Sequence, residues 1–277
     1  MAAASSPRPG RSRTKRSRNP EARMPLMAHL VEFRNRFIIS AIAVVLGMIG
    51  GFLLTEVVFD AIRVPITELA AVRTGGAVLN FSNVTTGFDI RLQMALTLGI
   101  VISSPVWLYQ VWMFLMPGLK KRERRYALGF VGAAIPLFLA GCAVGWMLMP
   151  RIVEVMAGFA PSQDAIYLDA KYYYSFVLQL CLAVGIAFVM PVLLVLLNLA
   201  GVLEGRTILK GWRVAVLLVA LFAALATPSA DVLSMFLLMI PMIGLYFLAV
   251  GISLIVDRRR RKRQAAAEAE IESELSS

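Results

Sequence analysis

The stretch that decides the fold is Tyr172–Leu203, YYYSFVLQLCLAVGIAFVMPVLLVLLNLAGVL, which holds no Asp, Glu, Lys, Arg or His. A helix that spans a bilayer needs about 20 such residues, so this run is long enough to cross a membrane. Five further runs share this character: Phe37–Thr55, Leu92–Leu119, Tyr126–Pro150, Val214–Ala230 and Val232–Val256. Membrane barrels are excluded because their strands are short and alternate in polarity. The sequence therefore predicts an all-α polytopic membrane protein with six transmembrane helices.

The composition agrees with this fold class. The chain is 59% hydrophobic and only 16% charged, with a mean hydropathy of +0.75, which is too apolar for a soluble protein of this size. Its net charge of +11 does not indicate nucleic-acid binding, because the cations follow alternate loops. With the amino terminus inside, 23 Lys and Arg residues fall on that side and 5 on the other. The positive-inside rule then predicts that both termini are cytoplasmic.

Proline and glycine give the expected shape of the bundle. Four prolines lie inside apolar runs: Pro105, Pro136, Pro191 and Pro241. Because proline bends helices, they predict a curved bundle. Val214–Ala230 is short, and only a turn around Asp231 follows it, so we expect the last two spans to form a short hairpin. Two GxxxG pairs, Gly47 with Gly51 and Gly141 with Gly145, predict close contacts between helices of the same chain.

The chain divides into three parts. Residues 1–23 are basic and rich in Ser and Pro, which predicts a disordered cytoplasmic tail. Residues 24–257 form the membrane domain, and residues 258–277 form a charged cytoplasmic tail.

Cys142 and Cys181 lie inside apolar runs and are expected to pack in the core, and His29 is the only histidine. Such a chain offers little basis for a metal site, a cofactor or nucleophilic catalysis, so we expect no enzyme.

Two lone carboxylates stand out among the cations of the predicted cytoplasmic face. The segment before the first span, PLMAHLVEFRNRF (residues 25–37), predicts an amphipathic helix with Glu32, Arg34 and Arg36 facing water. A simpler interpretation is a cationic anchor in which Glu32 pairs with Arg36 one turn later. Glu123 is the single acid among five cations in residues 120–125. If folding brings Glu32 and Glu123 together, they form an acidic site suited to guanidinium groups.

These segments resemble the TatC family, the receptor subunits of the twin-arginine protein translocase. The matching motifs are PLMAHLVEFRNR (residues 25–36), SPVWLYQVWMFLMPGL (104–119), ERR (123–125), Thr227-Pro228 with Asp231, and Ile240-Pro241-Met242. The resemblance implies a site in the bacterial cell membrane where Glu32 and Glu123 engage the paired arginines of a signal peptide on a folded cargo protein. By position, Arg34, Arg36 and Phe114 complete that surface.

The resemblance also implies partners. Pro65, in the first outside loop, and Asp231, in the last hairpin, match positions expected to serve assembly. The implied partners are the single-span subunits TatA and TatB, other copies of TatC and the lipid bilayer, with transport driven by the proton-motive force. Two positions depart from the family pattern: many members carry a glutamate where this chain has Val189, and some carry a glutamine where it has Met235.

Two other functions remain open at the level of the sequence. The first is a small-molecule or lipid transporter whose substrate path follows the concave face of the bundle. The second is a scaffold that gathers other membrane helices through its glycine faces. A transporter would be expected to hold ionisable groups inside its spans, and the six apolar runs contain none.

Overall fold

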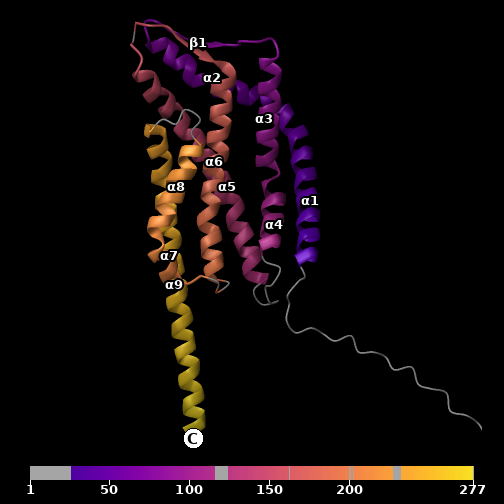
Figure 1. The fold of residues 1–277 in the computed structure, drawn as a ribbon, viewed down its shortest axis with the longest axis vertical. Coiled ribbons are helices and arrows are strands. Elements are labelled where there is room, and N and C mark those ends of the chain that lie inside the picture. The colour runs from indigo at the N-terminus through magenta and orange to yellow at the C-terminus, as the bar shows by residue number, and fades with distance from the viewer. Residues whose placement is uncertain are drawn as a thin grey trace, which may run out of the picture.

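The computed structural model describes residues 26–115, 124–161, 163–199, 201, 203–226 and 232–276. Figure 1 shows long helices standing side by side, with α2 and β1 at one end of the bundle. The start of α1 and the last part of α9 lie at the opposite end. Both ends of the described chain therefore leave the same end of the bundle. The expectations for residues 1–23, Glu123 and Asp231 concern positions outside the described residues.

The helices confirm a multi-pass helical protein. Four helices contain a stretch long and apolar enough to cross a membrane: α1 (Leu26–Leu53), α5 (Arg124–Gly158), α6 (Ala170–Leu199) and α9 (Val232–Ser276). A fifth candidate is the pair α3 (Thr86–Ile102) and α4 (Ser104–Leu115). The remaining apolar helix, α8 (Trp212–Ala226), has 15 residues, fewer than the about 20 that a full bilayer needs. By length and composition the described helices supply four or five spans, and the sixth remains a prediction.

The second predicted span is bent rather than straight. Helices α3 and α4 meet at Ser103 with an angle of 61° between them. Pro105 is the second residue of α4, where its missing N–H costs no helical hydrogen bond. The ring of a proline also clashes with the carbonyl four residues before it, here that of Val101 in α3, so α3 cannot continue through Pro105. The bend expected from Pro105 is thus confirmed.

The last helix corrects the prediction of two short final spans. α8 is short, as expected, but α9 has 45 residues and runs from Val232 to Ser276. After Val256 the sequence consists mainly of Arg, Lys, Gln, Ala and Glu, all strong helix formers, with no Gly or Pro. Nothing in the sequence ends the helix where the charges begin. In Figure 1 its charged half extends beyond the other helices.

The loops at the α2 end hold regular structure. α2 (Thr55–Val72) follows α1 and contains Pro65. An unexpected feature is a two-stranded parallel sheet of β1 (Ala77–Asn80) and β2 (Ile166–Asp169), in which Ala77 lies opposite Ile166. The prediction of an all-helical chain is wrong here, because strands of four residues are too short to show a period and their partners are distant in sequence.

Helix α6 is the centre of the packing, and glycines set the closest helix contacts. α6 contacts α3, α5, α8 and α9, and it carries buried side chains such as Tyr174, Val177 and Leu180. A Cβ atom on Gly141 of α5 would lie 2.8 Å from the Cα of Gly185 on α6, and one on Gly145 would lie 2.8 Å from the Cα of Cys181. The predicted glycine contacts within the chain are confirmed. Both cysteines are half-buried and pack against the core, also as predicted.

Candidate functional site

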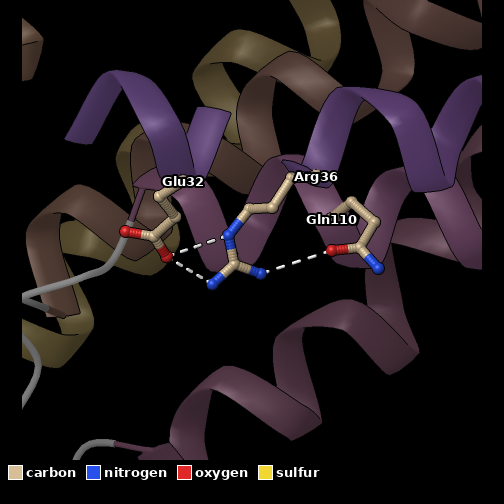
Figure 2. A network of polar contacts seen from close by, with 3 residues as sticks. All are labelled: Glu32, Arg36 and Gln110. Carbon is tan, nitrogen blue, oxygen red and sulfur yellow. Dashed lines mark hydrogen bonds and ion pairs between the residues drawn. The ribbon is translucent and has the colours of Figure 1, made fainter. Parts of the chain in front are cut away.

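An ion pair lies near the beginning of α1. The Nε and Nη2 atoms of Arg36 both donate to Oε1 of Glu32, at 2.9 and 2.5 Å. The residues are one helical turn apart, which places their side chains on the same face. This contact is the one predicted by the simpler interpretation of the segment as a cationic anchor. Figure 2 shows both guanidinium nitrogens directed at one carboxylate oxygen.

A glutamine on α4 extends this pair into a network between two helices. Nη1 of Arg36 donates to Oε1 of Gln110 at 3.3 Å (Figure 2). The side chains of Glu32 and Arg36 are each only 21% exposed, because they face α4. The prediction that both would face water is wrong, whereas Arg34 is exposed as expected. The sequence placed the apolar run of α1 correctly, but the polar face of this helix packs against α4 instead of facing water.

The second oxygen of Glu32 has no hydrogen-bond partner among the residues that the structure describes. This atom, Oε2, is buried, whereas Oε1 accepts both bonds from Arg36. A covered carboxylate oxygen without a donor is costly, commonly by about 1–3 kcal/mol or more for a charged group. The site therefore has one unused acceptor that a further N–H donor can satisfy.

Aromatic rings form the wall next to the ion pair. The ring of Phe114, near the end of α4, stacks on His29 of α1 with centroids 4.5 Å apart and planes at 14°. Phe33 lies on Phe114 at 5.2 Å and 58°. Leu30 and Phe37 are each 62% exposed, so the apolar side of α1 stays open, as expected for a face that contacts lipid. The site combines a carboxylate, a guanidinium and an apolar aromatic wall.

The structure unites some of the predicted site residues and leaves others untested. Glu32, Arg36 and Phe114 lie together at the α1–α4 contact. Glu123 and Asp231 lie outside the described residues, so the proximity of Glu32 and Glu123 remains a prediction. Pro65 lies inside α2, at the other end of the bundle from the start of α1 (Figure 1). Among the described residues, those assigned to recognition therefore lie far from α2, which carries Pro65, one of the two residues assigned to assembly.

Sequence reasoning missed two members of the site, His29 and Gln110. Gln110 was noticeable as one of few amides in an apolar run, and a buried amide usually marks a partner on another helix. Gln93 follows the same rule, because its Oε1 accepts from Ser175 Oγ at 2.7 Å. His29 gave no comparable signal, since a ring contact with a residue 85 positions away has no local pattern.

The opposite end of the bundle holds an apolar cavity. A volume of about 260 Å³ is lined by twelve residues, among them Leu69, Ile152 and Phe176 from α2, α5 and α6. Arg73 holds the end of α5 and the loop that follows it next to this cavity, because its guanidinium donates to the carbonyls of Ala157, at 2.7 Å, and of Ala160, at 3.1 Å. In the described part of the chain, no three His, Cys, Asp or Glu side chains gather where they could hold a metal ion.

The family model "Sec-independent protein translocase protein (TatC)" matches residues 28–241, which include both helices of the site. This chain belongs to the TatC family. The TatC of Xylanimonas cellulosilytica is 43% identical over 267 residues, covering 96% of this chain and 94% of that protein. The TatCy protein of Bacillus subtilis is 33% identical, covering 88% of this chain and 94% of its relative.

Solved structures of the family have the same fold. A crystal structure described as the twin arginine translocase receptor TatC in DDM aligns with a TM-score of 0.73 at 31% identity. The alignment covers 81% of this chain and 99% of that chain. A second structure of this receptor aligns with a TM-score of 0.72. Membership in the TatC family makes this chain a component of a protein translocase and not an enzyme.

The packing also bears on the alternative of a helix-gathering scaffold. That function requires the glycine faces to be open to other proteins, yet Gly47 and Gly51 of α1 contact α3, and Gly141 and Gly145 of α5 contact α6. Those faces are covered by the chain's own helices. The transporter alternative gains no specific support either, because the apolar cavity lies at one end of the bundle and is lined mainly by apolar side chains.

Proposed function

We propose that this chain is the signal-peptide receptor of a twin-arginine translocase, and that Glu32 binds an arginine of the signal peptide. The observation that carries this proposal is the buried, unpartnered Oε2 of Glu32 beside an aromatic wall. A guanidinium group brings several donors in a fixed fork, so it can bond to Oε2 while Arg36 keeps Oε1. A lysine offers only a point charge.

The second arginine of the signal peptide is assigned to Glu123. This residue follows Phe114 by nine positions, in the segment that joins α4 to α5, and it is flanked by cations. Since Phe114 stacks on His29, the end of α4 lies next to the beginning of α1. The cations around both glutamates, including the exposed Arg34, disfavour basic peptides that lack the paired arginines.

The test is the affinity of the detergent-solubilised full chain for a twin-arginine signal peptide and for its twin-lysine variant. We expect the arginine peptide to bind about tenfold more tightly, a difference of about 1.4 kcal/mol. Glu32→Gln and Glu123→Gln should each remove this preference. Glu56→Gln is a matched control, because Glu56 is 75% exposed and lies in α2, at the other end of the bundle. Unchanged preference in both site variants would refute the assignment.

We further propose that the chain lies in the bacterial cell membrane with both termini in the cytoplasm, and that it assembles with TatA, TatB and further TatC copies through surfaces near Pro65 and Asp231. The distribution of 23 cations against 5 supports this orientation. Single cysteines introduced at Val78 and Gln264, in a chain whose native cysteines are replaced, should react with a membrane-impermeant thiol reagent from opposite sides. Labelling of both positions from one side would contradict the topology.

Copurification with TatA and TatB tests the assembly sites. Pro65→Ala is expected to reduce recovery of the partners while the protein still binds the signal peptide, because α2, which contains Pro65, lies at the other end of the bundle from the start of α1 (Figure 1). If the variant loses both its binding of the signal peptide and its recovery of the partners, the result indicates misfolding instead of a local assembly defect. Full recovery of both partners would remove Pro65 from the assembly surface.

A further inference from the structure

A second charged site lies where the apolar part of α9 ends. The apolar run that begins at Val232 ends at Val256, and Asp257 and the six cations Arg258–Arg263 follow it directly. Charges that begin at the end of a spanning helix mark the level of the lipid headgroups. The nearby start of α8 has the same character, since Trp212 is 45% exposed and the guanidinium of Arg213 lies 5.8 Å from the centre of its ring.

At this level, α7 (Gly205–Lys210) and α9 enclose a small pocket of about 80 Å³. Its lining residues are Arg206 of α7 and Leu254, Asp257, Arg258 and Arg261 of α9. The four positions on α9 follow the spacing i, i+3, i+4 and i+7, so they form one face of the helix. α7 packs closely on that face, because a Cβ atom on Gly205 would lie 3.0 Å from the backbone nitrogen of Leu254. Three arginines thus line one pocket.

The acid in this pocket does not neutralise the arginines by direct pairing. Oδ1 of Asp257 accepts from Nδ2 of Asn198 at 2.9 Å, and Oδ2 accepts from the backbone N–H of Gly205 at 2.7 Å. Both carboxylate oxygens are therefore used to hold α6, α7 and α9 together. No ion pair involves Arg206, Arg258 or Arg261 in the described part of the chain. The pocket keeps a surplus of positive charge.

We propose that this pocket binds the phosphate group of an anionic phospholipid. Guanidinium groups bind phosphate oxygens through two parallel hydrogen bonds, which arginines on two different helices can supply from two sides. Leu254 gives the pocket an apolar wall on the side of the membrane-spanning part of α9, where the glycerol and acyl chains of a lipid would lie. Anionic lipids also concentrate next to basic segments that adjoin a membrane span. A bound lipid would link α7 to α9 at their contact.

The experiment measures binding of phosphatidylglycerol to the delipidated full chain in neutral detergent, with phosphatidylcholine as the zwitterionic comparison. Retention of lipid is read by native mass spectrometry, and thermal stability is read in parallel. We expect wild type to bind phosphatidylglycerol about tenfold more tightly than phosphatidylcholine. Arg206→Gln and Arg261→Gln should each lose most of that difference. Equal binding of the two lipids by wild type would overturn the proposal.

Two controls make the result specific. Arg263→Gln removes the same charge from the same helix, but Arg263 does not line the pocket, so its lipid preference should stay within about twofold of wild type. If Arg263→Gln and Arg206→Gln lost the lipid preference equally, the lipid would be attracted by the overall charge of this region and not bound in the pocket, and the proposal would be overturned. Inorganic phosphate is the second control: displacement of phosphatidylglycerol by millimolar phosphate would overturn the lipid assignment. Arg206 and Arg261 lie on different helices, so if one of the two variants misfolds, the other still tests the pocket.

Discussion

Gly47 of α1 and Gly99 of α3 lie backbone to backbone: a Cβ atom on Gly47 would be 2.6 Å from the carbonyl oxygen of Gly99. The contact is reciprocal, because a Cβ atom on Gly99 would be 2.7 Å from the backbone nitrogen of Met48. Backbone atoms on both sides cannot move aside as a flexible side chain can. This contact fixes the distance between α1 and the helix that leads into α4, and so it positions Glu32 relative to Gln110.

Gly99→Ala is therefore expected to lower stability by about 1–3 kcal/mol, the usual range for overpacking. The control is Gly50→Ala, since Gly50 is on α1 but a Cβ atom there meets no atom within 4 Å. Gly50→Ala should be neutral or slightly stabilising, because alanine favours helices. Thermal unfolding in detergent measures both variants. A Gly99→Ala protein as stable as Gly50→Ala would show that α1 and α3 can separate without cost.

The ion pair of α1 allows a second prediction, independent of any ligand. Exposed pairs at this spacing contribute about 0.3–0.5 kcal/mol, but Glu32 and Arg36 are each only 21% exposed and are held by Gln110. A double-mutant cycle with Glu32→Ala, Arg36→Ala and both together should give a coupling energy of about 1 kcal/mol or more. The measurement is unfolding free energy in detergent. A coupling near zero would mean that solvent screens the pair.

The sequence predicted the parts of this site that local patterns can carry. Apolar runs placed the helices, Pro105 predicted the bend between α3 and α4, and the spacing of Glu32 and Arg36 predicted their pairing. What the sequence could not give was which face of α1 packs on α4. That orientation depends on the contact between Gly47 and Gly99, which lie 52 positions apart, and no periodicity within one helix reports it.

The same limit explains the two largest differences from expectation. The β1–β2 pair joins Ala77 to Ile166, and only the folded arrangement of α2, α5 and α6 brings these segments together. The length of α9 was missed for another reason. A change from apolar to charged residues at Asp257 marks the end of a membrane span, but it does not mark the end of a helix.

Arg73 leads to a third prediction, about the loop after α5. Its guanidinium donates to the carbonyl of Ala157, in the last turn of α5, and to the carbonyls of Ala160 and Pro161, in the loop that follows this helix. Arg73→Lys keeps the charge but cannot reach three carbonyls in a fixed fork. We expect faster amide hydrogen exchange in residues 159–165 for this variant. Arg63→Lys is the control, since Arg63 is exposed in α2, and equal exchange in both variants would contradict the role of Arg73.

The fourth prediction concerns pH and the start of α6. Asp169 precedes α6 and caps it, because its Oδ1 accepts from the backbone N–H of Tyr172 at 2.9 Å. Its Oδ2 accepts from Ser82 Oγ at 2.5 Å, which ties the loop after β1 to the same point. The bond from Ser82 and then that from Tyr172 hold the pKa of Asp169 below its ordinary value. A lowered pKa means that the folded state prefers the charged carboxylate.

The stabilisation by Asp169 is accordingly complete above the pKa of the unfolded chain, about 3.9, and is lost as the pH falls through the lower pKa of the folded state. At pH 7 we expect Asp169→Ala to unfold at a lower temperature than wild type, and the difference should shrink below about pH 4. Asp169→Asn can still accept the bond from Tyr172, so its stability relative to Asp169→Ala should not vary with pH over this range. Asp164→Ala controls for removing an exposed acid elsewhere in the loop. A constant difference between wild type and Asp169→Ala from pH 7 to pH 3 would show that the charge of Asp169 does not hold the start of α6.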